Sequence, residues 1–257
     1  MMQPKVRQFL NINIDYNMDF SEELKIVYKI ANTQINIFPY PHLYINDIFT
    51  DSFYTQIIKH LPQYDQLKTL SEVRPVPKGG YLERFAINLD DESLSVLNDK
   101  KYIFWSNFRK QFLSGGIKNF LLSTKFSAYV KARFPNFEKL YFYDELLLIN
   151  DTLNYSLGPH TDSPKKVMSF LFYLPEDDSQ IKLGTSIYIP KDTSFDCIGL
   201  KHHHHDDFIK IHTNDFLPNS VFAFIKTNNS FHGVEKLVSD ERRWVLLYDI
   251  YVQDEKK

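Results

Sequence analysis

The sequence predicts an α+β protein in which a helical first half is followed by a β-rich second half with a sandwich or jelly-roll architecture. Helical patterns end near residue 134. From residue 138 onward, short segments rich in β-branched and aromatic residues end at Asn, Asp, Pro or Gly. These segments follow the helices instead of alternating with them, which argues against a parallel, doubly wound sheet. We therefore expect one domain over residues 1–257, with residues 1–137 supporting a β core over residues 138–253.

Composition limits the classes of function. Hydrophobic residues make up 43% and charged residues 24% of the chain, which excludes a fully disordered or fibrous protein. Lys and Arg number 30 against 32 Asp and Glu, so the chain lacks the strong positive charge of a dedicated nucleic-acid binder. A single cysteine, no signal-peptide pattern and no long apolar run predict a cytoplasmic protein without a membrane partner.

The first half contains helical patterns bounded by recognisable end signals. Ser21 is a suitable N-cap, and Glu22 and Glu23 lie where the helix dipole favours acidic side chains. Proline and glycine mark the ends of the later patterns. The expected helices cover residues 21–30, 51–61, 100–113 and 117–134, and the expected strands cover residues 38–49 and 81–89.

The second half contains the strands of the β core. Their apolar and aromatic side chains are typical of strands that pack on both faces. The expected strands cover residues 139–150, 167–174, 185–190, 208–212, 220–225 and 243–252.

A candidate metal site begins at His160 and Asp162, between two of these strands. Residues two apart in extended chain point to the same side, so this histidine and this aspartate can share one metal ion. His232, 70 residues after Asp162, follows one strand and precedes the last one. Two histidines and one carboxylate on one side of a metal are typical of non-haem Fe(II) oxygenases, although Mn(II), Co(II) or Zn(II) could use the same ligands.

Two arginines begin the last strand. A buried arginine is costly unless it meets an anion, and its planar guanidinium suits a carboxylate. Arg242 and Arg243 point to opposite faces of the strand. We expect Arg242 to face the interior together with Trp244, Leu246 and Tyr248, because this set is more aromatic, and Arg243 is the alternative.

These pieces together resemble a known family. The sequences HTD at 160–162, FHGV at 231–234 and the arginine pair at 242–243 are similar to those of 2-oxoglutarate/Fe(II)-dependent dioxygenases with a double-stranded β-helix, in the prolyl hydroxylase-like branch. The segment from Phe38 to Pro62 resembles the family's N-terminal strand and helix.

The resemblance implies a function. His160, Asp162 and His232 would bind Fe(II), 2-oxoglutarate would chelate the iron with its far carboxylate on Arg242 or Arg243, and O2 would be the co-reactant. The reaction would hydroxylate a C–H bond of a small molecule or a protein side chain and release succinate and CO2. Asn228, beside His232, is a candidate substrate contact.

Other interpretations remain open. A cupin-like enzyme could use the same three ligands without 2-oxoglutarate, and a non-catalytic jelly-roll protein could bind carbohydrate without any metal. The histidine run 202–205 is expected to be an exposed loop with weak, adventitious metal affinity, because consecutive residues cannot all converge on one ion.

Overall fold

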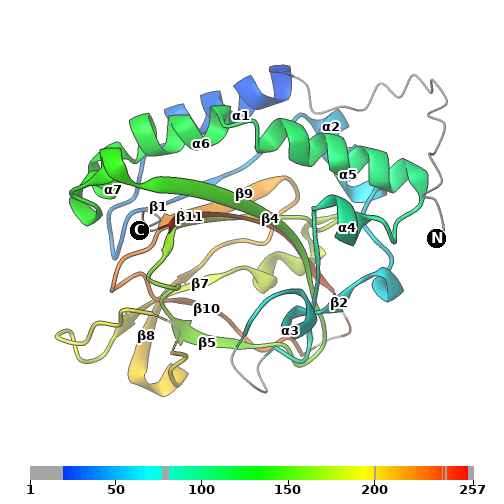
Figure 1. Ribbon diagram of the computed structural model, residues 1–257. Coiled ribbons are helices and arrows are strands. Elements are labelled where there is room, and N and C mark those ends of the chain that lie inside the picture. Colours follow the sequence, from blue (N-terminus) through cyan, green and yellow to red (C-terminus); the bar gives the residue numbers. More distant parts are fainter. Residues whose placement is uncertain (1–19, 77–80, 200, 239, 241, 254–257) are drawn as a thin grey trace, which may run out of the picture.

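The computed structural model describes residues 20–76, 81–199, 201–238, 240 and 242–253 (Figure 1). Two antiparallel sheets face each other, and helices cover the outer face of the larger sheet (Figure 1). This arrangement is an α+β fold with a jelly-roll core, as the sequence predicted. Among the described residues, no helix combines the length and apolar character needed to cross a membrane.

The larger sheet has seven strands and includes segments from both halves of the chain. Its order is β1 (His42–Ile45), β9 (Ser220–Ile225), β6 (Lys166–Tyr173), β11 (Arg243–Gln253), β4 (Tyr141–Asp151), β3 (Arg84–Asn88) and β2 (Lys68–Thr69). The long central strand β11 pairs with β4 along its whole length, from Arg243 opposite Asp151 to Gln253 opposite Tyr141. This register places Arg243 and Asp151 side by side on the sheet.

The smaller sheet has four strands, two of which are very short. Its order is β5 (Leu157–His160), β10 (His232–Val234), β7 (Ser186–Pro190) and β8 (Phe208–Thr213). The sequence patterns did not predict β5 or β10. Glycine and proline occur within β5, and β10 has three residues, too few for an alternation to be recognised.

The two faces of β11 pack against different partners. Val245 and Leu247 belong to the cluster enclosed between the sheets, together with Tyr173, Phe222 and Phe224. Leu246, Tyr248 and Ile250 instead pack with the helices on the other face. The expectation that Trp244, Leu246 and Tyr248 line the interior is therefore wrong. Both faces of this strand are buried, so the more aromatic face cannot be assumed to be the inner one.

The helical layer comprises mostly the predicted helices. Its members are α1 (Phe20–Asn32), α2 (Asp51–Lys59), α4 (Asp91–Leu94), α5 (Asp99–Phe112), α6 (Gly116–Phe120) and α7 (Ser127–Arg133). The short helix α3 (Leu70–Val73) lies apart from them, and Leu70 packs in the cluster between the sheets. Figure 1 shows α1, α5 and α6 lying across the larger sheet.

The helix expected over residues 117–134 is interrupted by a π-helical turn over Leu121–Lys125. In an uninterrupted α-helix, Ile117 and Val130 would lie about 140° apart around the axis. Both side chains are buried, at 1% exposure each. The Phe126 N–H donates to the Leu121 carbonyl, and this wider turn changes the helical phase so that both residues can contact the core.

Candidate metal centre

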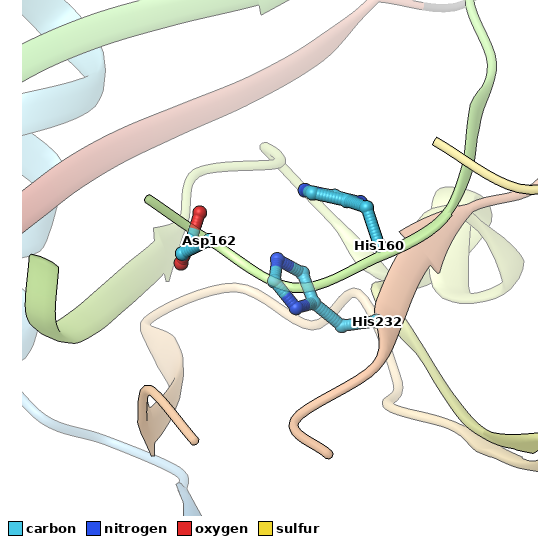
Figure 2. Close-up of side chains that lie close together, drawn as sticks. All are labelled: His160, Asp162 and His232. Atoms are coloured by element: carbon cyan, nitrogen blue, oxygen red, sulfur yellow. The ribbon is translucent and has the colours of Figure 1, made fainter. Parts of the chain in front are cut away.

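Two histidines from neighbouring strands and one aspartate meet at one end of the smaller sheet. His160 ends β5, His232 begins β10, and these two residues are cross-strand partners. Asp162 lies two residues beyond the end of β5. One ligand atom from each of the three side chains can be chosen so that all lie within 4.8 Å of one another (Figure 2). The structure therefore brings together the three residues that the sequence singled out.

Hydrogen bonds orient both imidazoles. The Nδ1 atom of His160 is 3.0 Å from the Gly158 carbonyl oxygen, and that of His232 is 2.9 Å from the Ser230 carbonyl oxygen. A carbonyl only accepts, so each Nδ1 carries the proton and each Nε2 keeps a lone pair for a metal. Burial lowers the pKa of both histidines, which favours the neutral form that metal binding needs.

Asp162 is held by two neighbours. Lys166 Nζ lies 3.2 Å from Oδ1, and the Ser169 hydroxyl donates to Oδ2 at 3.0 Å. Burial alone would raise the pKa of Asp162, but the positive charge of Lys166 lowers it overall, so the side chain is a carboxylate. Lys166 also pairs with Asp249 at 2.9 Å, which fixes the lysine between two carboxylates.

Aromatic rings surround the histidines. The ring centroid of Phe224 lies 4.4 Å from that of His232, and the ring centroid of His202 lies 4.8 Å from that of His160. His202 Nε2 is also 2.9 Å from the Tyr81 hydroxyl. The histidine run was expected to be an exposed loop with weak, adventitious metal affinity, and His202 is indeed exposed. The run lies between β7 and β8, but His202 packs directly beside the candidate ligand His160.

The loop that carries His202 lies against β5. The His203 N–H donates to the Pro159 carbonyl at 2.9 Å. A Cβ atom at Gly158 would lie 2.5 Å from the His203 carbonyl oxygen, closer than two such atoms can approach. Glycine at position 158 therefore permits this close backbone contact.

Arg243, and not Arg242, faces the interior. Arg243 is 0% exposed, and its Nη1 lies 2.8 Å from Asp151 Oδ2. Its Nε donates to the Leu183 carbonyl at 2.6 Å and its Nη2 to the Thr185 hydroxyl at 3.1 Å. Arg242 is exposed, with its guanidinium 4.4 Å from the centre of the Tyr64 ring. The expected orientation of Arg242 is wrong for the reason given above for β11.

A second buried arginine shares the same carboxylate. Arg84 donates to Asp151 through Nε at 2.6 Å and through Nη2 at 2.9 Å. Two guanidinium groups thus surround one carboxylate, which leaves one positive charge in excess inside the protein. Arg84 was not predicted as a site residue, because only the pairing of β3 and β11 with β4 brings Arg84 and Arg243 to Asp151.

Asn228 lies on the loop that leads into β10, four residues before His232. Its Oδ1 accepts from Lys226 Nζ at 3.3 Å, and its Nδ2 donates to Asp196 at 3.3 Å. The side chain lines a surface cavity next to this loop.

Comparisons with solved structures identify proteins that share this fold. No family profile matches the sequence, and no curated protein matches it. A prolyl 4-hydroxylase structure from Pseudomonas putida is similar with a TM-score of 0.50 and 12% identity, over 88% of this chain and 96% of that chain. A prolyl 4-hydroxylase structure from Phytophthora capsici is similar with a TM-score of 0.51 and 15% identity, over 95% of this chain and 69% of that chain. The chain therefore shares its jelly-roll fold, a double-stranded β-helix, with structures of prolyl 4-hydroxylases.

Proposed function

We propose that the protein is an Fe(II)- and 2-oxoglutarate-dependent dioxygenase that hydroxylates a C–H bond of a small-molecule or peptide substrate. The observation that carries this proposal is the convergence of His160, Asp162 and His232 within 4.8 Å. The fold shared with structures of prolyl 4-hydroxylases supports the same reaction class.

The donor set suits Fe(II). Two neutral imidazole Nε2 atoms and one carboxylate would occupy one side of the ion and leave the opposite positions open for a cosubstrate and O2. The carbonyl groups of Gly158 and Ser230 hold both rings in the required tautomer. Lys166 and Ser169 hold the carboxylate of Asp162 in place.

The environment of Arg243 suits the far carboxylate of 2-oxoglutarate. A guanidinium has five N–H donors, and those of Arg243 donate to Leu183, Asp151 and Thr185. A bidentate carboxylate could use the second donor on each Nη atom, in competition with the Tyr173 hydroxyl, which also interacts with this guanidinium. The excess positive charge from Arg84 keeps the site attractive to an anion although Asp151 is present. We therefore assign the anchoring role to Arg243.

The residues of this chain would prepare the site for the reaction. Bound iron and 2-oxoglutarate would supply the oxidising power for hydroxylation, with release of succinate and CO2. The rings of Tyr173 and Phe216 lie 5.6 Å and 5.3 Å from the Arg243 guanidinium, and they exclude water from its charge. The ring of Phe224 likewise excludes water beside His232. A dry pocket strengthens the attraction between Arg243 and a carboxylate.

The test replaces one ligand. Asp162→Ala should abolish Mn(II) binding measured by electron paramagnetic resonance and abolish Fe(II)-dependent succinate formation from 2-oxoglutarate. The fold should persist, because Lys166 retains its ion pair with Asp249. Asp178→Ala, which changes an exposed aspartate, is the matched control and should alter neither property.

The alternatives give different results. A wild-type protein that binds the metal but neither binds nor consumes 2-oxoglutarate would indicate a cupin-like enzyme. A wild-type protein without metal affinity would indicate a non-catalytic binding protein. Unchanged metal binding and turnover in Asp162→Ala would contradict the ligand assignment.

A further inference from the structure

We propose that Lys226 and Arg133 form a cationic subsite beside the metal centre, and that this subsite binds a carboxylate or phosphate group of the prime substrate. The inference rests on the proposed function and adds a chemical class of substrate to it.

Lys226 extends the inner face of β9. Phe222 and Phe224 on this strand belong to the cluster between the sheets. Side chains alternate along a strand, so Lys226, two residues after Phe224, continues on the same face. Phe224 contacts the His232 ring, and Lys226 therefore lies at the end of the inner face that is next to the metal centre.

The charge of Lys226 lacks a carboxylate partner. The residue is 1% exposed, and its Nζ donates to the Asn228 amide oxygen at 3.3 Å. No ion pair with Lys226 occurs within residues 20–76, 81–199, 201–238, 240 and 242–253. Burial, and then the charge of Arg133, lower the pKa of Lys226 to about 8. A buried lysine in this situation is stabilised by a bound anion.

Arg133 adds a second positive charge to the same place. Its Nη1 donates to the carbonyl oxygens of Lys166 at 2.6 Å and Lys226 at 2.9 Å, and its Nη2 donates to that of Pro164. These neutral carbonyls orient the guanidinium without cancelling its charge. No carboxylate of the described chain pairs with it, and two of its five N–H donors remain for a ligand.

Both side chains line a cavity of about 570 Å³. Asn228 and Asn229 form part of its polar wall, while Ile37, Pro39 and Tyr129 form an apolar wall. The cavity volume is within the range of sites for small organic ligands. A ligand with an anionic group and an apolar body therefore matches the two walls.

The cavity is close to the metal-ligand segments. The Tyr40 hydroxyl, on the same cavity, donates to the carbonyl of Phe231, which precedes His232. The Pro164 carbonyl that binds Arg133 is two residues after Asp162. The negative charge of Asp162 also raises the pKa of Lys226 and Arg133, opposing the lowering effect of burial. A metal ion bound to Asp162 would neutralise this negative charge. Lys226 and Arg133 would then need another anion to balance their positive charges.

The experiment compares benzoate with its neutral, similarly shaped analogue benzamide, and adds phenyl phosphate as a second anion. Dissociation constants of benzoate, phenyl phosphate and neutral benzamide are measured at pH 7 by ligand-observed saturation-transfer NMR, on the full chain loaded with Zn(II) and saturated with 2-oxoglutarate. We expect wild-type protein to bind benzoate at least tenfold more tightly than benzamide. Lys226→Met should reduce this ratio below twofold, and Lys226→Arg should retain it. Lys182→Met, which removes an exposed lysine from a different cavity, is the control and should also retain it.

The results separate this inference from the proposed function. Whichever of benzoate and phenyl phosphate binds more tightly identifies the preferred anion. Equal affinity for benzoate and benzamide, or an unchanged ratio in Lys226→Met, overturns the subsite even if metal and 2-oxoglutarate bind. Loss of 2-oxoglutarate binding in Lys226→Met also overturns it, because Lys226 would then anchor the cosubstrate. If the wild-type protein binds no metal but still prefers benzoate to benzamide in a Lys226-dependent way, the anion subsite is supported and the dioxygenase proposal is refuted.

Discussion

Replacing Arg243 by methionine tests whether the 2-oxoglutarate anchor is Arg243, the first residue of β11, or Arg242, the residue before it. Methionine keeps an unbranched apolar stem but removes the charge and all five N–H donors. The Leu183 carbonyl and the Thr185 hydroxyl lose a donor. Asp151 keeps its two hydrogen bonds from Arg84, so no buried carboxylate is left without a partner. The variant should therefore fold, although it should be less stable than the wild type.

The expected loss of 2-oxoglutarate affinity follows from the two Nη hydrogen bonds that we assign to its far carboxylate. Each hydrogen bond to a charged group contributes about 1.5–3 kcal/mol. Loss of both at the lower limit costs about 3 kcal/mol, which corresponds to an increase in Kd of about 150-fold. Arg242→Met removes only a surface contact with Tyr64, so its Kd for 2-oxoglutarate should stay within twofold of the wild type.

Isothermal titration calorimetry on Mn(II)-loaded, oxygen-free protein measures the Kd of 2-oxoglutarate for Arg243→Met and for Arg242→Met. Each measurement is made below the unfolding temperature of the variant. Arg243→Lys keeps a positive charge but loses the planar fork, and it should give an intermediate Kd. A larger loss of affinity in Arg242→Met than in Arg243→Met would refute the assignment, and so would an unchanged Kd in Arg243→Met.

Further predictions concern stability. Asp151→Asn leaves the buried guanidinium groups of Arg84 and Arg243 without a charged partner. The free energy of unfolding measured by urea denaturation should therefore fall by about 3–5 kcal/mol. A loss below about 1 kcal/mol would contradict the importance of these two ion pairs. Burial lowers the pKa of His60 below its ordinary value of 6.5. At a pH between the lowered pKa and 6.5, the unfolded chain binds more protons than the native state. The free energy of unfolding should therefore fall as the pH drops below 6.5. His60→Gln should lessen this dependence in urea titrations by at most about 1.4 kcal/mol per pH unit, and an identical profile would exclude His60 as its source. Gly158→Ala should displace the His203 carbonyl and speed hydrogen exchange of the His203 amide measured by NMR, whereas unchanged protection would show that the backbone contact is not needed.

The helices and long strands could be predicted because their signals are local. The helix expected over residues 51–61 occurs as Asp51–Lys59, where Thr50 caps it by accepting from the Phe53 N–H. The strand expected over residues 220–225 occurs with those bounds. The short strands β5 and β10 have no such signal, since three or four residues cannot show a period.

The orientation of β11 could not be derived from its own residues. The alternation placed Arg242 and Arg243 on opposite faces, but both faces are apolar because one packs on helices and the other on the smaller sheet. Only the helical layer determines which face is outside, and that layer comes from the first half of the chain. Arg84 was missed for a related reason, because a lone arginine at the start of a strand gives no sign of its partner on β4.

The sequence by itself singled out His160, Asp162 and His232 as candidate metal ligands, because two histidines and an aspartate carry suitable donor atoms. It also determined the succession of helices and strands, which depends on contacts within a few residues. Only the tertiary structure decided that His160 and His232 are cross-strand partners, that Arg243 faces inward, and that Lys226 is buried. Pairing of strands depends on how distant segments bury their faces together, and this is a property of the whole packed chain.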